Sequence, residues 1–180
     1  PVNPSTDAVL GRQCYPAVSD IPGAVDLAVV AVPPKLVPDI VDDCGEKNVP
    51  AMVVISGGFK EVGNEGLEQD MLTRAQEHGI RIIGPNCIGV FNGTTGFNTF
   101  FQRDMELPGP GPIAVLTQSG TMGIGLLETC SDIGVSKFVS YGNAADVNEQ
   151  ELLSYLARDS ATDVIAMYIE GIQNGRALFE

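Results

Sequence analysis

The fold is decided by Val25-Asp26-Leu27-Ala28-Val29-Val30-Ala31-Val32, a valine-rich run that a single acidic residue interrupts. A continuous apolar run without polar alternation is typical of a strand that is covered on both faces, as in a parallel sheet. Further runs of this kind cover residues 51–55, 81–83, 113–116, 137–140 and 164–169. We therefore expect a sheet protein whose strands are buried on both sides.

Helical patterns separate these runs, and they cover residues 37–47, 65–77, 120–131 and 149–158. In the second of them, Leu67, Met71 and Ala75 recur every four residues and so share one helix face. Strands that alternate with helices predict βαβ units with right-handed crossovers and a parallel sheet. The fold class expected is α/β.

Residues at the helix ends support these boundaries. Asn64 and Asn148 precede two of the helices as N-cap candidates, and Gly79 follows the second helix at the position where a C-terminal glycine is favoured. His78 lies at the same helix end, where a cation is stabilised, so we assign it a structural role. The acidic run of the first helix is interpreted as a solvated face, and it comprises Asp39, Asp42, Asp43 and Glu46.

The stretch 84–111 interrupts the alternation of strands and helices. It is rich in glycine and proline, shows no periodicity and ends at Pro108-Gly109-Pro110-Gly111-Pro112. Because so long a loop is uncommon inside a compact domain, we expect a domain boundary here. The units predicted are residues 1–107 and 108–180. Both ends of the sequence look like interrupted elements, so a piece of a longer chain is expected.

The composition narrows the class of protein. Ten Lys and Arg against 23 Asp and Glu give a net charge of −13, which disfavours a nucleic-acid partner. With 44% apolar and 18% charged residues, the chain can bury a core. No apolar run approaches the roughly 18–20 residues of a membrane span, so a soluble, cytoplasmic protein without a membrane partner is expected.

The cysteines indicate neither a metal site nor a disulfide framework. Cys14, Cys44, Cys87 and Cys130 are far apart, and the single histidine cannot complete a zinc cage with them at any usual spacing. We expect four reduced thiols and no bound metal.

Candidate site residues follow from the rule that open parallel sheets bind ligands at the carboxyl ends of their strands. The sharpest candidate is Gln118-Ser119-Gly120-Thr121, which leads from a strand into a helix. Small residues let an anion approach the free N–H groups and the positive end of the helix dipole, which favours phosphate or carboxylate. The alternative is an ordinary strand-to-helix turn in which Ser119 is the N-cap.

Two other strand ends also carry candidate residues. Glu170 ends an apolar strand, where its carboxylate could orient a histidine or hold a cation, or could simply be solvated. Ser56-Gly57-Gly58-Phe59 resembles a phosphate or amide cradle, but equally a plain turn. The dinucleotide fingerprint GxGxxG follows none of the strands, although a loop after an earlier strand would lie before Pro1.

Taken in order, the motifs resemble those of the nucleoside-diphosphate-forming acyl-CoA synthetases, the superfamily that includes the α-subunit of succinyl-CoA synthetase. Each motif is weak alone, but the ordered set covers nearly the whole chain. The segments that carry the resemblance are Pro1–Pro4, Asp26–Pro33, Val54–Glu61, Ile83–Gly89, Gln118–Thr121, Ser140–Val147 and Tyr168–Gly171.

The resemblance implies a Rossmann-like CoA-binding domain followed by a partial flavodoxin-like ligase domain. It further implies that acyl-CoA, ADP and phosphate are converted reversibly into carboxylic acid, CoA and ATP through an acyl phosphate and a phosphohistidine. Ser119, Gly120 and Thr121 would hold the phosphoryl group, and Glu170 would orient the histidine. The residues that would line the coenzyme A site are Asn3, Pro4, Val32, Pro33, Ser56, Gly57, Gly58, Phe59, Asn86 and Cys87.

The same resemblance implies parts that lie outside these residues. The phosphohistidine would follow residue 180, and the glycine-rich CoA loop would precede Pro1. ADP or ATP and Mg²⁺ would bind through a nucleotide-grasp domain or subunit, and the full-length protein is expected to form an oligomer. Because Ile124 replaces the tyrosine of the succinyl branch, acetate or another monocarboxylate is favoured over succinate.

Two alternatives remain open at the level of the sequence. One is a CoA-sensing regulatory module, as in protein acetyltransferases with a ligase-like region that lacks the catalytic histidine. The other is an NAD(P)-binding Rossmann oxidoreductase, which the α/β pattern alone supports.

Overall fold

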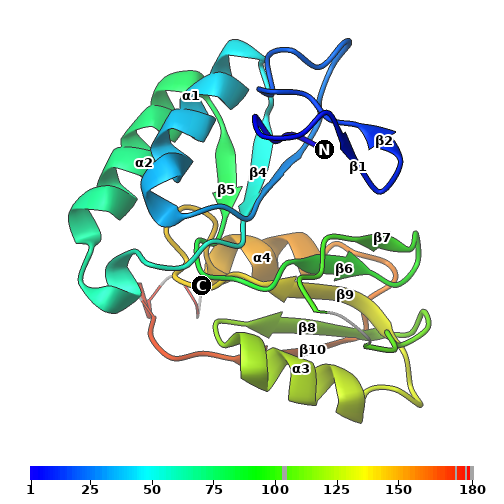
Figure 1. Ribbon diagram of the computed structural model, residues 1–180. Helices are drawn as coiled ribbons and strands as arrows, with labels where there is room; N and C mark the ends of the chain where they lie inside the picture. The colour runs from blue at the N-terminus through cyan, green and yellow to red at the C-terminus, as the bar shows by residue number, and fades with distance from the viewer. Residues whose placement is uncertain (103–104, 173, 177, 179–180) are drawn as a thin grey trace.

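The computed structural model describes residues 1–102, 105–172, 174–176 and 178, and it contains two main sheets (Figure 1). The first sheet is parallel and has the strand order β3-β4-β5. Its strands are β3 (Ala28–Val30), β4 (Ala51–Val54) and β5 (Arg81–Ile83). The three apolar runs predicted for this part of the chain therefore form one sheet.

Helices α1 (Val37–Glu46) and α2 (Glu65–His78) pack on one face of this sheet, on the left in Figure 1. The short 3₁₀ turns η1 (Pro34–Leu36) and η2 (Lys60–Val62) lead into them. Gly79 ends α2 with a φ of 69°, as the sequence predicted. Asn64 differs from its prediction: its side chain makes no cap bond and donates instead to the carbonyl of Gly58.

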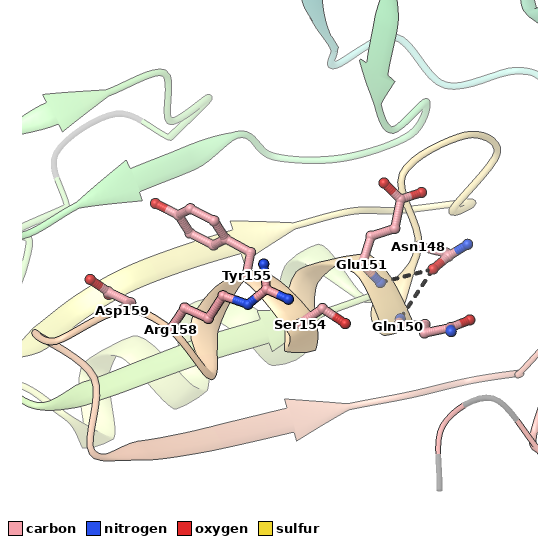
Figure 2. A pocket seen from close by; sticks show the side chains of 7 residues that line it. All are labelled: Asn148, Gln150, Glu151, Ser154, Tyr155, Arg158 and Asp159. Carbon is pink, nitrogen blue, oxygen red and sulfur yellow. Dashed lines mark hydrogen bonds between the residues drawn. The ribbon is translucent and has the colours of Figure 1, made fainter. Parts of the chain in front are cut away.

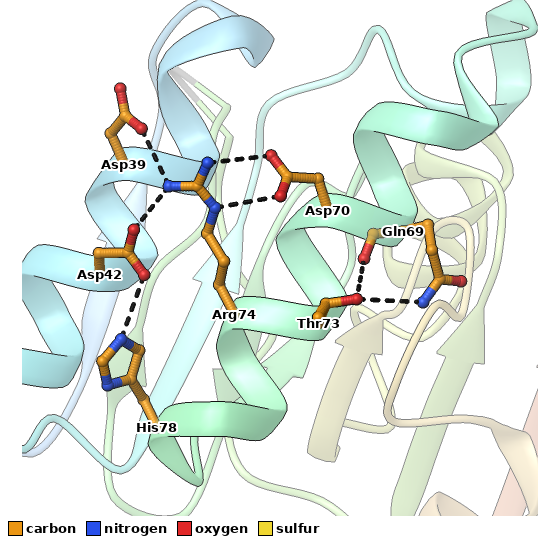
Figure 3. A network of polar contacts seen from close by, with 7 residues as sticks. All are labelled: Asp39, Asp42, Gln69, Asp70, Thr73, Arg74 and His78. Carbon is orange, nitrogen blue, oxygen red and sulfur yellow. Dashed lines mark hydrogen bonds and ion pairs between the residues drawn. The ribbon is translucent and has the colours of Figure 1, made fainter.

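The acidic face of α1 is not simply solvated. The guanidinium of Arg74 on α2 bridges Asp39 and Asp42, and His78 Nε2 lies 3.1 Å from Asp42 Oδ1 (Figure 3). Asp43 accepts hydrogen bonds from the backbone N–H groups of Val18 and Ser19. The acids therefore attach α1 to its neighbours, and His78 has the structural role that the sequence predicted.

The second sheet has the strand order β10-β8-β9-β6-β7. The strands β8 (Ile113–Thr117), β9 (Val135–Ser140) and β10 (Val164–Tyr168) are parallel. Alternate residues of β8 face opposite sides of this sheet: Val115 packs with Leu127 of α3 (Gly120–Thr129), and Leu116 packs with Leu152 of α4 (Glu149–Leu156). One helix therefore covers each face, and Asn148 caps α4 as predicted.

The strands β6 (Val90–Asn92) and β7 (Phe97–Asn98) correct the description of residues 84–111 as a loop without regular structure. They form a hairpin, and β6 pairs antiparallel with β9, Val90 opposite Val139. Two and three residues per strand are too few to show a period in the sequence. The hairpin belongs to the second sheet, although the predicted first unit, residues 1–107, includes it. The division of the chain at 107/108 stays a prediction.

The remaining features are small. A hairpin of β1 (Ala8–Val9) and β2 (Arg12–Gln13) lies near the N-terminus. All four cysteines are free thiols, as expected from their spacing, and all four are buried. Within the described residues, no helix combines the length and the apolar character that crossing a membrane requires.

The two sheets are joined by backbone hydrogen bonds between the turn after β9 and the end of β5. The N–H groups of Asn143, Ala145 and Val147 donate to carbonyls of residues 82–85 over 3.0–3.2 Å. Gly142 permits this approach, because a Cβ there would lie 2.1 Å from the carbonyl oxygen of Pro85. Its φ of 51° also disfavours a side chain.

We predict that Gly142→Ala lowers the free energy of unfolding by roughly 2–3 kcal/mol, because the methyl group must displace backbone in a left-handed conformation. Urea denaturation measures the change. Gly125→Ala is the control: it lies within α3 with nothing within 4 Å of the added carbon, so it should stabilise the chain by up to about 1 kcal/mol. Equal stability of the two variants would contradict the packing of the two sheets described above.

Candidate functional site

The carboxyl ends of strands from both sheets border one cavity of about 420 Å³. Segments that follow β4, β8, β9 and β10 all contribute to it, and this is the place where the strand-end rule predicts a ligand. Its lining residues are Lys60, Glu61, Gln118, Gly142, Asn143, Glu170, Gly171 and Ile172. The cavity therefore joins a loop of the first sheet to three loops of the second.

Gln118 fixes the backbone of Glu170 beside the start of α3. Its Oε1 accepts hydrogen bonds from the N–H groups of Glu170 and Gly171, at 2.5 and 3.0 Å, and its Nε2 donates to the carbonyl of Gly171. The Glu170 residue is exposed, so its carboxylate is open to a ligand or partner. The turn at 118–121 and the acid at 170 thus lie together.

Ser119, Gly120 and Thr121 begin α3 next to this cavity but are not among its lining residues. Ser119 Oγ accepts from the N–H of Met122 at 3.4 Å, which is the N-cap alternative considered for this turn. A Cβ on Gly120 would lie 2.7 Å from the Ile88 side chain, so close packing requires glycine there. Thr121 is exposed. Their role in holding a phosphoryl group stays a prediction.

The structure brings several predicted CoA-site residues together at the carboxyl end of the first sheet. The Ser56 hydroxyl donates to the carbonyl of Val32 at 2.6 Å and accepts from its N–H at 3.0 Å. The N–H of Asn86 donates to the carbonyl of Ser56, and a Cβ on Gly57 would lie 3.0 Å from Asn86 Oδ1. The loops after β3, β4 and β5 are therefore in direct contact.

Other predicted CoA-site residues differ in their exposure. Asn3, Pro4 and Pro33 are exposed and open to a ligand. Phe59 is 0% exposed in the hydrophobic core between the first sheet and its helices, so only its backbone could contact a ligand. Cys87 is also buried, and burial raises the pKa of its thiol to about 11. Its sulfur is therefore protonated at neutral pH, which makes it a packing group rather than a nucleophile.

The loop at residues 56–59, which resembled a phosphate or amide cradle or a plain turn, binds an acid of the same chain. Glu61 Oε1 accepts from the N–H groups of Gly58 and Phe59, at 2.5 and 3.2 Å, and Oε2 accepts from Asn143 Nδ2 at 2.7 Å. Burial opposes ionisation of this carboxyl, but the hydrogen bonds from Asn143, Gly58 and Phe59 outweigh it and hold its pKa below the usual 4.5. Two N–H groups of the cradle thus serve Glu61 rather than a phosphate.

A second hollow lies away from the strand ends. It is an open depression of about 660 Å³ along α4, shown in Figure 2. Its lining residues are Asn148, Gln150, Glu151, Ser154, Tyr155, Arg158 and Asp159, none of which the sequence singled out as a site residue.

Gln118 belongs to the strand-end segment that the sequence singled out, whereas Glu61 was not selected as a site residue. Gln118 follows β8 directly and Asn143 lies three residues after the end of β9, so the strand-end rule indicates both places. Glu61 offered no such signal, because its importance depends on the turn that brings its carboxylate back to Gly58.

The fold defines an α/β protein with two sheets whose strand ends meet at one cavity. A CoA-binding-domain family matches residues 1–93, more than half of the chain, and a succinyl-CoA-ligase-like flavodoxin domain matches residues 110–180. The chain belongs to the nucleoside-diphosphate-forming acyl-CoA synthetase family, and the predicted Rossmann-like and flavodoxin-like α/β folds are confirmed.

Similar proteins agree with this assignment. An ADP-forming acetate–CoA ligase I of Archaeoglobus fulgidus is 46% identical over 97% of this chain and 26% of that protein. The α-subunit of an ADP-forming acetate–CoA ligase II of Pyrococcus furiosus is 42% identical over 100% of this chain and 40% of the subunit. The chain therefore spans about a quarter to two-fifths of these relatives.

A solved structure has the same fold over nearly the entire chain. It is the dinucleotide-forming acetyl-coenzyme A synthetase 1 of Ca. Korarchaeum cryptofilum in complex with phosphate and ADP. The TM-score is 0.91 at 43% identity, covering 99% of this chain and 39% of that one.

We predict that Glu61→Gln reduces the loss of stability in acid. The pKa of Glu61 is lower in the folded chain than in the unfolded chain. Its stabilising contribution to the free energy of unfolding is therefore fully present above the pKa of the unfolded chain and is lost as the pH falls through the pKa of the folded chain. The free energy of unfolding, measured from about pH 6 to about pH 3, should fall less steeply in the variant. Glu77→Gln on the exposed side of α2 is the control for loss of one charge. An unchanged slope in Glu61→Gln would contradict the hydrogen bonds assigned to Glu61.

Proposed function

We propose that the chain is the CoA-binding and ligase portion of an ADP-forming acyl-CoA synthetase. The reaction converts acyl-CoA, ADP and phosphate into a carboxylate, CoA and ATP, reversibly, through an acyl phosphate and a phosphohistidine contributed from outside this chain. The observation that carries the proposal is the cavity at which the loops after β4, β8, β9 and β10 meet, with Glu170 fixed beside the start of α3.

The chemistry of the cavity supports transfer of a phosphoryl group. A carboxylate such as that of Glu170 can orient an imidazole and stabilise its positive charge while the ring carries a proton or a phosphoryl group. The free N–H groups at the start of α3 favour the negative charge of the transferred group. Their positions on adjacent strand ends allow both effects to act on one group.

The residues at the end of the first sheet fit the uncharged arm of coenzyme A better than its phosphates. Val32 and Pro33 offer apolar contacts and Asn86 offers a polar side chain, whereas Glu61 occupies the N–H groups of Gly58 and Phe59. When bound, coenzyme A supplies the thiol that accepts or releases the acyl group. Val32, Pro33, Gly57 and Asn86 would hold its arm.

The acyl substrate we propose is acetate or another small monocarboxylate. Two of the similar proteins are named acetate–CoA ligases, and Ile124 stands where the succinyl branch has tyrosine. The CoA-binding-domain match also favours coenzyme A over a nicotinamide dinucleotide.

We further propose that the complete protein includes a nucleotide-grasp domain or subunit, which binds ADP or ATP with Mg²⁺, and that it forms an oligomer in the cytoplasm. Support comes from the related synthetase described in complex with phosphate and ADP and from the relative named as an α-subunit. Four buried free thiols are consistent with a reducing compartment.

We predict that Glu170→Gln in the complete enzyme lowers the rate of phosphoenzyme formation from ATP on the order of 100-fold, because the neutral amide no longer stabilises the charged imidazole. Labelling with radioactive ATP, quenched over a time course, measures this rate. Glu128→Gln, an exposed acid of α3, is the control and should label like the unaltered enzyme. Normal labelling of Glu170→Gln would exclude Glu170 from the transfer step.

A further inference from the structure

Asn143 connects the loop of residues 56–59, which belongs to the predicted coenzyme A site, with the cavity. Its Nδ2 donates to Glu61 Oε2 at 2.7 Å and to Glu68 Oε2 at 2.8 Å, and its Oδ1 accepts from Asn86 Nδ2 at 3.4 Å. Both amide hydrogens and the amide oxygen are therefore used. All three partners precede the hairpin in the chain, whereas Asn143 follows β9 of the second sheet.

Glu61 extends this connection to the loop after β4. One carboxylate oxygen accepts from Asn143, and the other accepts from the N–H groups of Gly58 and Phe59. Glu61 and Asn143 also line the cavity together with Glu170. One carboxylate and one amide therefore link the proposed coenzyme A site to the proposed phosphoryl-transfer site.

The orientation of the Asn143 amide is determined by its surroundings. Its backbone N–H donates to the Pro85 carbonyl, which fixes the residue against the first sheet. Glu68 on α2 is only 7% exposed, and a buried carboxylate requires hydrogen-bond donors. A rotated amide would direct its oxygen at two carboxylates, so only the observed orientation satisfies Glu61 and Glu68 together.

We propose that Asn143 and Glu61 are positioning residues that hold the 56–59 loop at the edge of the cavity, so that the acyl-bearing end of coenzyme A faces the phosphoryl-transfer residues. This inference rests on the proposed function. It requires a neutral donor at position 143, because a carboxylate there would face the acids of Glu61 and Glu68 and release the loop.

The test uses the complete enzyme and measures the KM for CoA, kcat and phosphoenzyme formation from ATP. Asn143→Asp places a third carboxylate beside Glu61 and Glu68, so the KM for CoA should rise about tenfold. The rate of phosphoenzyme formation from ATP should change far less, since that step does not use CoA, whereas kcat should fall with the misplaced acyl end. Lowering the pH should reduce the KM defect as the clustered acids take up a proton.

A double variant separates positioning from simple loss of structure. In Asn143→Asp with Glu61→Gln, the new amide can donate to the new carboxylate, so the KM for CoA should fall below that of Asn143→Asp but recover only in part, since the carboxylate at position 143 still faces Glu68. Asn148→Asp is the control, since aspartate caps a helix as well as asparagine does, and it should leave the KM for CoA unchanged.

If Asn143→Asp does not fold, Asn143→Ala provides the same comparison without added charge and should also raise the KM for CoA. An unchanged KM in the variant that folds, or a double variant no better than Asn143→Asp, would overturn the positioning role. Absence of both phosphoenzyme and CoA-dependent turnover in the unaltered enzyme would instead overturn the proposed function, and this inference with it.

Discussion

Three backbone hydrogen bonds determine the arrangement on which the site depends. The N–H groups of Asn143, Ala145 and Val147 donate to the carbonyls of Pro85, Gly84 and Ile82, which joins the turn after β9 to the end of β5. Parallel strands in each sheet end at a common edge, and these bonds bring the two edges together. Side chains reinforce these bonds: Asn143 donates to Glu61 and Glu68, and Arg81 of β5 pairs with Asp146 and Glu151.

The polar groups at this junction are satisfied by one another. Glu61 accepts from the loop after β4 and from Asn143, and Gln118 binds the backbone at Glu170 and Gly171. Each of these groups has its hydrogen-bond partners within the junction, so each restrains the position of the next. The loops at the candidate site are thus held by hydrogen bonds within the chain, while Glu170 is exposed.

Much of the fold followed from local patterns in the sequence. Continuous valine-rich runs located the parallel strands, and local signals located Gly79 and Asn148 at helix ends. The β6–β7 hairpin was missed because its strands have two or three residues and are stabilised by pairing with distant β9. In the site, strand ends indicated Glu170 and the 118–121 turn. Glu61 and Glu68 were not found, since their roles depend on Asn143, which lies far along the chain.

The central claim is that the two strand-end loops form one rigid junction, and hydrogen–deuterium exchange at Asn143, Ala145 and Val147 tests it most directly. Amides that are bonded between two packed sheets exchange only when the junction opens. The structure predicts slow exchange at all three, close to the slowest amides of β8 and β9. Exchange as fast as that of the exposed residues near Ser5 would show that the sheets are not joined in this way, and the shared cavity would have to be abandoned.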